Sequence, residues 1–196
     1  MVIDYKKILE TNTEFYKKYY EFDETHHLHR MPGEHYKLLT YLSYLYDGIT
    51  ILDVGTSLGE SCLALAQNKK NKVISYDIRK EPLSYLKDYE NIEYKILDIN
   101  LEDINIIKSA KIIFFDIGHD GVSEKKFSDM LEKIDYKGYV FCDDVFSKIY
   151  PQCTDWFSKL NIEKYDISEV GHSSPIYGHG TGLLNYYNDN SVTIIK

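Results

Sequence analysis

Aspartates stand at or beside the ends of five short apolar runs in the middle of the chain. They are Asp53, Asp77, Asp98, Asp116 and the adjacent pair Asp143 and Asp144. In an open sheet of parallel strands, ligands bind at the carboxyl ends of the strands, near the point where the strand order reverses. One aspartate at such a place can equally cap the helix that follows it. The whole series, however, favours a binding cleft that is lined with carboxylates.

Three of these aspartates could bind a metal ion. Asp116 follows the fourth apolar run, and Asp143 and Asp144 follow the fifth, so two strand ends would bring three carboxylates together. Oxygen ligands of this kind suit a hard divalent cation, Mg²⁺ before Ca²⁺ or Mn²⁺. The alternative is that Asp116 caps a helix and that the pair lies in an ordinary acidic loop.

The apolar pattern predicts the elements that would position these aspartates. Nearly continuous apolar runs between turn residues are typical of strands that are buried on both faces. We expect strands at residues 49–54, 72–77, 92–97, 111–116 and 138–143, helices from about residue 62 and over 82–87, 124–134 and 156–160, and a final antiparallel hairpin of residues 163–170 and 181–187. This alternation predicts a Rossmann-like, doubly wound α/β sheet of about seven strands, mostly parallel, with helices on both faces.

Length and composition favour one domain. The chain has 196 residues, of which 43% are hydrophobic and 28% are charged, as in ordinary globular proteins. Since no repeat or linker divides it, we expect a single domain over residues 1–196. Residues 1–47 read as an N-terminal helical cap over the carboxyl edge of the sheet, and residues 48–196 as the Rossmann-like core.

Charge and cysteine usage exclude several classes of protein. A net charge of −8 argues against a non-specific nucleic-acid binder, which needs a basic surface. The N-terminus does not read as a signal peptide, and no run approaches the ~20 apolar residues of a membrane span. The three cysteines lack CxxC spacing, which disfavours a zinc site and suits a reducing compartment. We therefore expect a cytoplasmic protein with neither a nucleic-acid nor a membrane partner.

The turn after the first predicted strand has a distinctive glycine spacing. After Asp53 it contains Gly55, Thr56, Ser57, Gly59 and Ser61. Glycines allow the backbone to approach a ligand closely and to turn tightly into a helix. The second glycine comes four residues after the first, so the turn is not the GxGxxG fingerprint of dinucleotide sites. It resembles motif I of the class I S-adenosylmethionine-dependent methyltransferases.

The resemblance implies a site for S-adenosylmethionine. In that family the glycines face the methionine part, the leading acid lies near its ammonium group, an acid after the second strand binds the ribose hydroxyls, and the end of the third strand contacts adenine. Carried onto this chain, the site would comprise Asp53, Gly55, Thr56, Ser57, Gly59, Ser61, Asp77, Ile78, Asp98, Ile99 and Asp116. A carboxylate-rich rim suits this cofactor, because it carries an ammonium and a sulfonium group and no pyrophosphate.

The second half resembles the metal-dependent O-methyltransferases of the catechol type and of the antibiotic-sugar type. In these families a divalent metal holds two neighbouring substrate oxygens. Asp116, Asp143 and Asp144 match the metal positions, with Asp144 as in the sugar branch where the catechol type has asparagine. His119 matches a lysine base, and its ordinary pKa near 6.5 suits a general base. Asp120 is a reserve candidate for the base, and His119 could instead cap a helix or contact the cofactor.

The resemblance implies an S-adenosylmethionine-dependent O-methyltransferase that acts on a hydroxylated small molecule, such as a sugar, with Mg²⁺ assistance. Three alternatives stay open: a metal-independent methyltransferase of a protein or other acceptor, a non-catalytic S-adenosylmethionine-binding module, and a nucleotide-binding oxidoreductase. The aromatic residues near 15–22 could form a substrate lid, part of the core or a contact between copies of the chain. Five further histidines lie in polar loop stretches. In the resembling enzymes the region of His26, His27 and His29 covers cofactor and substrate, and the loop of His172 and His179 builds substrate walls. The alternative is that each is a solvated loop residue.

Overall fold

A seven-stranded sheet forms the centre of the protein. The computed structural model describes residues 1–19, 35–78, 84–171 and 179–196. The strands of the sheet are β2 (Thr50–Val54), β3 (Lys72–Asp77), β4 (Ile92–Ile96), β5 (Ala110–Phe115), β6 (Tyr139–Cys142), β7 (Glu163–Asp166) and β8 (Gly182–Asn185). They lie in the order β4-β3-β2-β5-β6-β8-β7. Only β8 runs against the others, since it pairs antiparallel with both β6 and β7.

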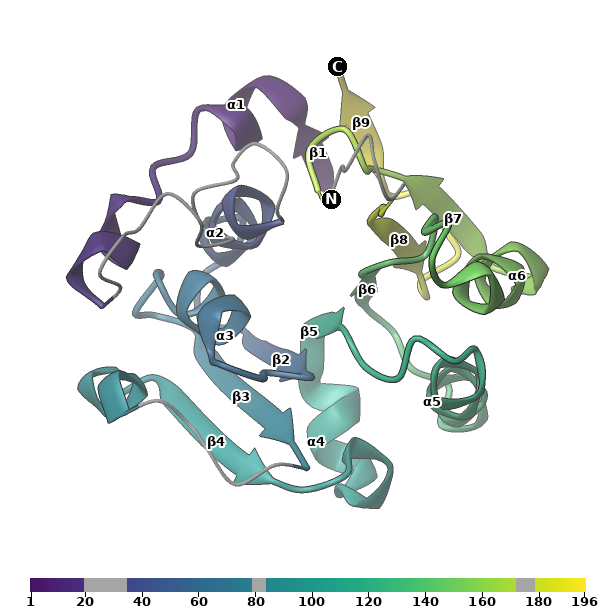
Figure 1. Cartoon of the computed structure of the whole chain (residues 1–196), viewed down its shortest axis with the longest axis horizontal. Helices are drawn as coiled ribbons and strands as arrows, with labels where there is room; N and C mark the ends of the chain where they lie inside the picture. The colour runs from purple at the N-terminus through teal and green to yellow at the C-terminus, as the bar shows by residue number, and fades with distance from the viewer. Residues whose placement is uncertain (20–34, 79–83, 172–178) are drawn as a thin grey trace.

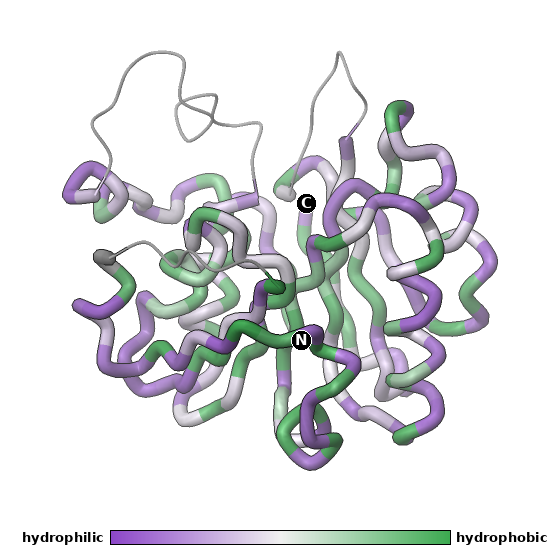
Figure 2. The backbone as a smooth tube through the Cα atoms, turned by 60° about the horizontal axis from the view of Figure 1, so that its bottom comes forward, coloured by the Kyte–Doolittle hydropathy of each residue, from purple (hydrophilic) through white to green (hydrophobic). Residues whose placement is uncertain are grey.

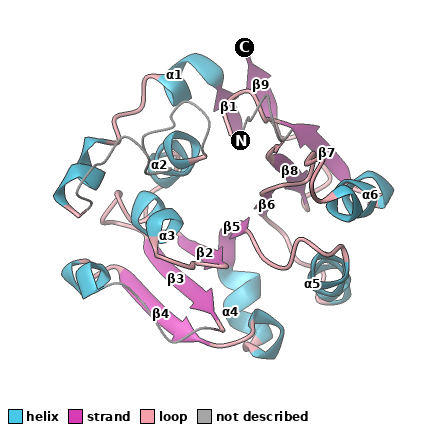
Figure 3. Ribbon diagram, viewed as in Figure 1, coloured by secondary structure: helices cyan, strands magenta, loops and turns pink. Residues whose placement is uncertain are grey.

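Helices cover both faces of the sheet (Figures 1 and 3). They are α1 (Tyr5–Leu9), α2 (Tyr36–Tyr44), α3 (Glu60–Leu65), α4 (Ile104–Ser109), α5 (Val122–Lys133) and α6 (Pro151–Lys159), with short 3₁₀ turns at Glu14–Lys18, Ser84–Asp88 and Ile99–Leu101. In Figure 1, α2 and α3 lie on one side of the curved row of strands, and α4, α5 and α6 lie on the other. The layers are therefore helix, sheet and helix, as the sequence pattern predicts.

The strands alternate their side chains between two hydrophobic clusters. In β5, Ile112 and Phe114 join the cluster that contains α1, α2 and α3, whereas Ile113 and Phe115 join the cluster beneath α4, α5 and α6. All four side chains are at most 2% exposed. Figure 2 shows the hydrophobic residues gathered along these central segments of the chain. Burial on both faces explains why the strands read as nearly continuous apolar runs.

The predicted fold is confirmed, and the strand boundaries differ from the predicted ones by only a few residues. The N-terminal region departs from the prediction. The expected purely helical cap begins instead with strand β1 (Val2–Asp4), which pairs in parallel with β9 (Thr193–Ile195) in a second, two-stranded sheet. The two ends of the chain therefore lie side by side (Figure 1). Helix α2 packs on α3, against a face of the sheet, and only its start approaches the carboxyl edge.

Other differences concern short elements. Helix α4 was not expected, because its six residues offer less than two turns of apolar periodicity. The helix expected at 82–87 falls partly outside the described residues, and its described part is a 3₁₀ turn. None of the helices in the described ranges combines the length and hydropathy that a membrane-spanning helix requires.

The turn after β2 lies directly against the backbone after β5. Gly55 has φ +97°, and a Cβ on this residue would lie 1.8 Å from the backbone oxygen of Asp116. The Asp116 N–H donates to the carbonyl oxygen of Val54 at 2.9 Å. Only glycine combines this left-handed φ with this close approach, so the motif glycine joins the two halves of the carboxyl edge.

Replacing Gly55 tests this contact. We expect Gly55→Ala to lower the free energy of unfolding by more than ~3 kcal/mol, because backbone strain and an overlap with main-chain atoms add together. Gly48→Ala is the matched control, since Gly48 has φ +70° and a Cβ added there would have no other atom within 4 Å. This control should lose only about 1 kcal/mol. Urea denaturation measures both values, and equal losses would contradict the assignment.

Candidate functional site

A cavity of about 540 Å³ opens at the carboxyl ends of β2, β3, β4 and β5. Its lining includes the predicted positions Gly55, Ser57, Asp77, Ile78, Asp98, Ile99 and Asp116, together with Tyr76, Leu97, Asn100, Ile117, Gly118, His119, Ser123 and Lys126. A volume of this size is typical of a site for a small molecule or cofactor. The structure therefore brings together most of the positions that the sequence predicted for a cofactor.

The glycine turn is fixed against the end of β3. The N–H groups of Gly55 and Thr56 both point to the carbonyl oxygen of Tyr76, at 2.9 and 3.2 Å. The Ser57 N–H donates to a carboxylate oxygen of Asp77 at 2.8 Å. Ser57 adopts φ +46° at this point. These contacts hold the Asp77 carboxylate at the rim of the cavity.

Asp53 lies beneath the turn. It lines neither this cavity nor a second, smaller cavity that adjoins it. Its side chain is completely buried and accepts hydrogen bonds from the hydroxyl groups of Thr56 and Ser75. Burial raises the pKa of its carboxyl group. Among the hydrogen bonds of the described residues, none reaches Asp53 Oδ1. Asp53 therefore supports the turn from below. Gly59 is likewise absent from both linings and packs against Leu86.

The end of β4 provides a second carboxylate. Asp98 accepts hydrogen bonds from the backbone N–H of Asn100 at 2.9 Å and from its side-chain amide at 2.8 Å. Lys126 Nζ lies 3.6 Å from the other carboxylate oxygen. Partial burial acts to raise the pKa of Asp98, but the Asn100 hydrogen bonds and the Lys126 charge outweigh it and lower the pKa. Asp98 is thus ionised and caps the 3₁₀ turn that borders the cavity.

His119 lies between aspartates that follow β5 and β6. His119 Nε2 lies 3.2 Å from Asp116 Oδ1, and His119 Nδ1 lies 3.7 Å from Asp144 Oδ2. The His119 ring stacks on Tyr150 with centroids 4.7 Å apart. Burial acts to lower the pKa of His119, yet the Asp116 hydrogen bond and the three nearby carboxylates raise it to about 9. The imidazole is therefore protonated at neutral pH.

Asp144 has two histidine neighbours. Its Oδ1 contacts His179 Nδ1, in addition to the contact between Oδ2 and His119. The residue is 6% exposed and adopts φ +56°. Burial and the adjacent Asp143 charge raise the pKa of its carboxyl group. His179 therefore belongs to this cluster, whereas residues 26, 27, 29 and 172 lie outside the described ranges.

His35 is a site residue that the sequence analysis missed. Its Nδ1 lies 3.5 Å from Asp143 Oδ2, and the side chains are only 5% and 6% exposed. Among the described residues, His35, Asp116 and Asp143 form one of two groups whose potential ligand atoms all lie within 4.8 Å of one another, and Asp144 belongs to neither group. No local pattern marks His35, since it precedes α2 by one residue and meets Asp143 only through the fold.

A smaller cavity of about 220 Å³ adjoins the first. Its lining contains His35, Tyr36, Gly55, Thr56, Ser57, Leu58, Glu60, Ser61 and Asp116. Gly55, Ser57 and Asp116 line both cavities. The predicted positions Thr56 and Ser61 thus face this second space. The two cavities together follow the glycine turn from the ends of β3 and β4 to the start of α2.

The structure gives Asp120 a capping position. Its side chain accepts hydrogen bonds from the N–H groups of Val122 and Ser123 at 2.9 and 2.8 Å, at the start of α5. These bonds lower the pKa of the exposed carboxyl group. Asp120 lines a groove between α5 and α6 and is absent from the lining of the two cavities.

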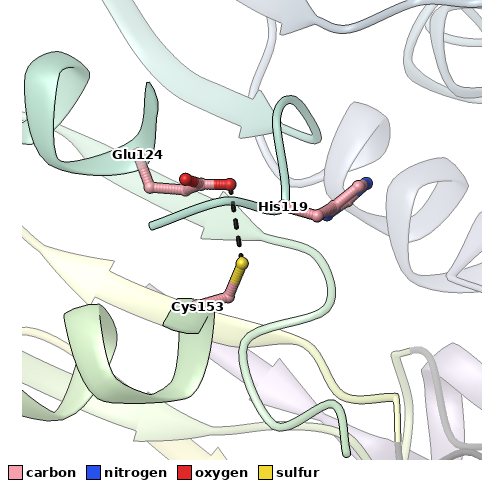
Figure 4. Close-up of side chains that lie close together, drawn as sticks. All are labelled: His119, Glu124 and Cys153. Atoms are coloured by element: carbon pink, nitrogen blue, oxygen red, sulfur yellow. Dashed lines mark hydrogen bonds between the residues drawn. The ribbon is translucent and has the colours of Figure 1, made fainter. Parts of the chain in front are cut away.

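The second group of potential ligands comprises His119, Glu124 and Cys153. Figure 4 shows Glu124 and Cys153 pointing toward each other from α5 and α6, with the His119 ring directed away. The Cys153 thiol donates to Glu124 Oε1 at 3.6 Å. Burial raises the pKa of Glu124, and burial together with Glu124 raises that of Cys153 to about 12. The thiol is therefore protonated at neutral pH and unsuited to act as a nucleophile.

Comparison with known proteins supports the fold. No family model matches the chain, and no curated protein matches its sequence. Solved structures do match. Cofactor-bound Rv0187 from MTB has a TM-score of 0.61 at 13% identity, covering 79% of this chain and 80% of the other. A protein from Staphylococcus aureus, assigned as a caffeoyl-CoA O-methyltransferase, has a TM-score of 0.56 at 16% identity, covering 76% of this chain and 82% of the other. An rRNA methylase from Streptococcus thermophilus has a TM-score of 0.55 at 15% identity, covering 76% of this chain and 93% of the other. The chain thus shares the fold of methyltransferase structures.

The raised pKa of His119 predicts how stability depends on pH without added metal. The imidazole has a folded pKa of about 9 against 6.5 when unfolded, so its ion pairs stabilise the fold fully below pH 6.5 and are lost as the pH rises through 9. In EDTA, His119→Gln should lower the free energy of unfolding by about 1–2 kcal/mol more at pH 6 than at pH 9.5, after allowance for solvent screening. Urea titrations at both pH values measure this difference, and a pH-independent effect would refute the ion pairs.

Proposed function

We propose that this protein is an S-adenosylmethionine-dependent methyltransferase that methylates a hydroxyl group of a small molecule, such as a sugar, with the help of a divalent cation. The observation that carries the proposal is the 540 Å³ cavity, which has the glycine turn at one end and the carboxylates of Asp77 and Asp98 at the ends of successive strands. The shared fold with methyltransferase structures supports it.

The residues of the cavity suit this cofactor. Asp77 can accept hydrogen bonds from two neighbouring ribose hydroxyls, a task for which a carboxylate has enough lone pairs. Leu97 and Ile99 provide apolar surface for the adenine ring beside Asp98. Gly55 and Ser57 adopt left-handed φ values and line the cavity, so the methionine part could lie along their backbone. When bound, S-adenosylmethionine supplies the methyl group and the sulfonium that makes it transferable.

The cluster after β5 and β6 supports metal-assisted chemistry on an oxygen. Asp116 and Asp143 offer carboxylate oxygens to a divalent cation, and Asp144 follows Asp143 in the chain. Such a cation lowers the pKa of a coordinated hydroxyl. Asp116 lines both cavities, so in this proposal the acceptor hydroxyl lies at the junction between cofactor and cation.

His119 is the proposed general base, on a condition that the geometry sets. Because its pKa is about 9 beside three carboxylates, it can accept a proton at neutral pH only when another positive charge neutralises those carboxylates. Asp120 is disfavoured for this role by its capping contacts and its position outside both cavities. The base and the cation are therefore interdependent in this proposal.

Binding of S-adenosylhomocysteine tests the cofactor assignment. Asp77→Asn keeps an acceptor for the Ser57 N–H but loses the charge, and should weaken binding roughly tenfold, the equivalent of about one charge-assisted hydrogen bond. Asp103→Asn is the matched control, because Asp103 is an exposed cap of α4 outside the cavity and asparagine caps equally well. Isothermal titration calorimetry measures the affinity of both variants for S-adenosylhomocysteine. Unchanged binding in Asp77→Asn would remove Asp77 from the site.

Methyl transfer from labelled S-adenosylmethionine to a panel of sugars and catechols tests the reaction. We expect turnover that EDTA abolishes, and a loss of about 10²–10⁴-fold in kcat for His119→Ala, with cofactor affinity nearly unchanged. Turnover that persists in EDTA would favour a metal-independent methyltransferase. Cofactor binding without turnover on any acceptor would favour a non-catalytic binding module.

A further inference from the structure

Three side chains from separate parts of the chain converge beside the smaller cavity. His35 stands one residue before α2, Asp116 follows β5, and Asp143 follows β6. Each offers one potential ligand atom, and these atoms all lie within 4.8 Å of one another. Because carboxylates and imidazoles that bind one ion must have their donor atoms this close together, the arrangement can bind a cation with little movement.

The His35 ring is held in place by its surroundings. It lies against Phe114 with centroids 4.7 Å apart and against Tyr36 at 4.8 Å. Its side chain and that of Asp143 are 5% and 6% exposed. The Thr181 hydroxyl lies 3.5 Å from the other oxygen of Asp143. The two buried groups are therefore orientated before any ligand arrives, which favours a specific site.

The site has an accessible side. His35 and Asp116 line the cavity of about 220 Å³, and Asp116 also lines the larger cofactor cavity. A cation between these residues would face open space into which substrate oxygens or water could enter. Metal sites that act on a substrate need such open coordination positions in addition to their protein ligands.

The sequence alone assigned Asp144 as the third ligand, but its geometry disagrees. Its two oxygens contact His179 and His119, and Asp144 is not part of the converging group. His35 takes that place and contributes a nitrogen in a set of two carboxylates. Imidazole suits first-row transition ions, whereas Mg²⁺ prefers oxygen ligands.

We propose that His35, Asp116 and Asp143 form a binding site for a first-row divalent transition ion, such as Mn²⁺ or Co²⁺, in preference to Mg²⁺. The inference rests on the proposed function for the presence of a cation, and it adds the identity of the third ligand and the selectivity. It also makes His35, the residue directly before α2, a direct part of the site.

Metal binding to the full-length, metal-free protein tests the proposal. Calorimetry with Mn²⁺, Co²⁺ and Mg²⁺ should show one site that binds Mn²⁺ and Co²⁺ at least ~10-fold more tightly than Mg²⁺. His35→Gln should weaken Mn²⁺ binding by roughly 10–100-fold. Asp103→Asn is the control, and it should leave Mn²⁺ affinity unchanged, since Asp103 is an exposed cap of α4 that lines neither cavity. Asp144→Asn should weaken Mn²⁺ binding less than His35→Gln does, because it removes a nearby charge but no ligand.

Pulsed electron paramagnetic resonance of the Mn²⁺-loaded protein gives a direct readout of the ligand. A ¹⁴N coupling from a ligating imidazole should appear in the wild type and in Asp144→Asn. His35→Gln should lack it at Mn²⁺ concentrations that load the site. The same His35→Gln sample must bind S-adenosylhomocysteine as the wild type does, which shows that the variant is folded.

Two results would overturn the proposal. One is a His35→Gln variant with wild-type Mn²⁺ affinity and an unchanged ¹⁴N coupling. The other is a wild-type protein that binds S-adenosylhomocysteine but prefers Mg²⁺ or binds none of the three ions. In the latter case the methyltransferase proposal survives. Failure to bind S-adenosylhomocysteine would refute that proposal, whereas the expected metal data would still support the His35 site.

Discussion

The contact between the turn after β2 and the backbone after β5 is the constraint on which the rest of the site depends. Gly55 approaches the Asp116 carbonyl so closely that no side chain fits between them, and the Asp116 N–H completes the contact with Val54. The contact places the carboxylate of Asp77, which is tied to the same turn, and the acids after β5 and β6 along one edge. The larger cavity and the acid cluster thereby share Asp116 as a common wall.

The second organising feature is the alternation of carboxylates and imidazoles. His119 lies between Asp116 and Asp144, and His35 lies against Asp143. Carboxylates this close together repel one another, and the protonated His119 reduces that repulsion in the metal-free protein. A divalent cation can supply the same positive charge. In the proposed function, binding of a metal ion would therefore favour loss of the His119 proton, so that metal binding and the charge of His119 are linked.

Much of the fold could be predicted because its information is local. Strand β5 reads as one continuous apolar run, and the acid that ends it, Asp116, lies where parallel sheets bind ligands. His35 could not be found in this way, because it meets Asp143 only through tertiary packing and has no pattern of its own. The pairing of β1 with β9 was missed for the same reason, since strands of three residues carry almost no periodic signal. The sequence shows the position of Asp53 in the motif but not its complete burial beneath the turn.

A crystal structure of the protein grown with saturating S-adenosylhomocysteine would show where the ligand lies. We expect the ribose hydroxyls on the Asp77 carboxylate, the adenine ring beside Asp98 and Ile99, and the homocysteine part along the turn at Gly55 and Ser57, within the 540 Å³ cavity. A cavity that stays free of the ligand, or a ligand bound in the groove between α5 and α6, would contradict it.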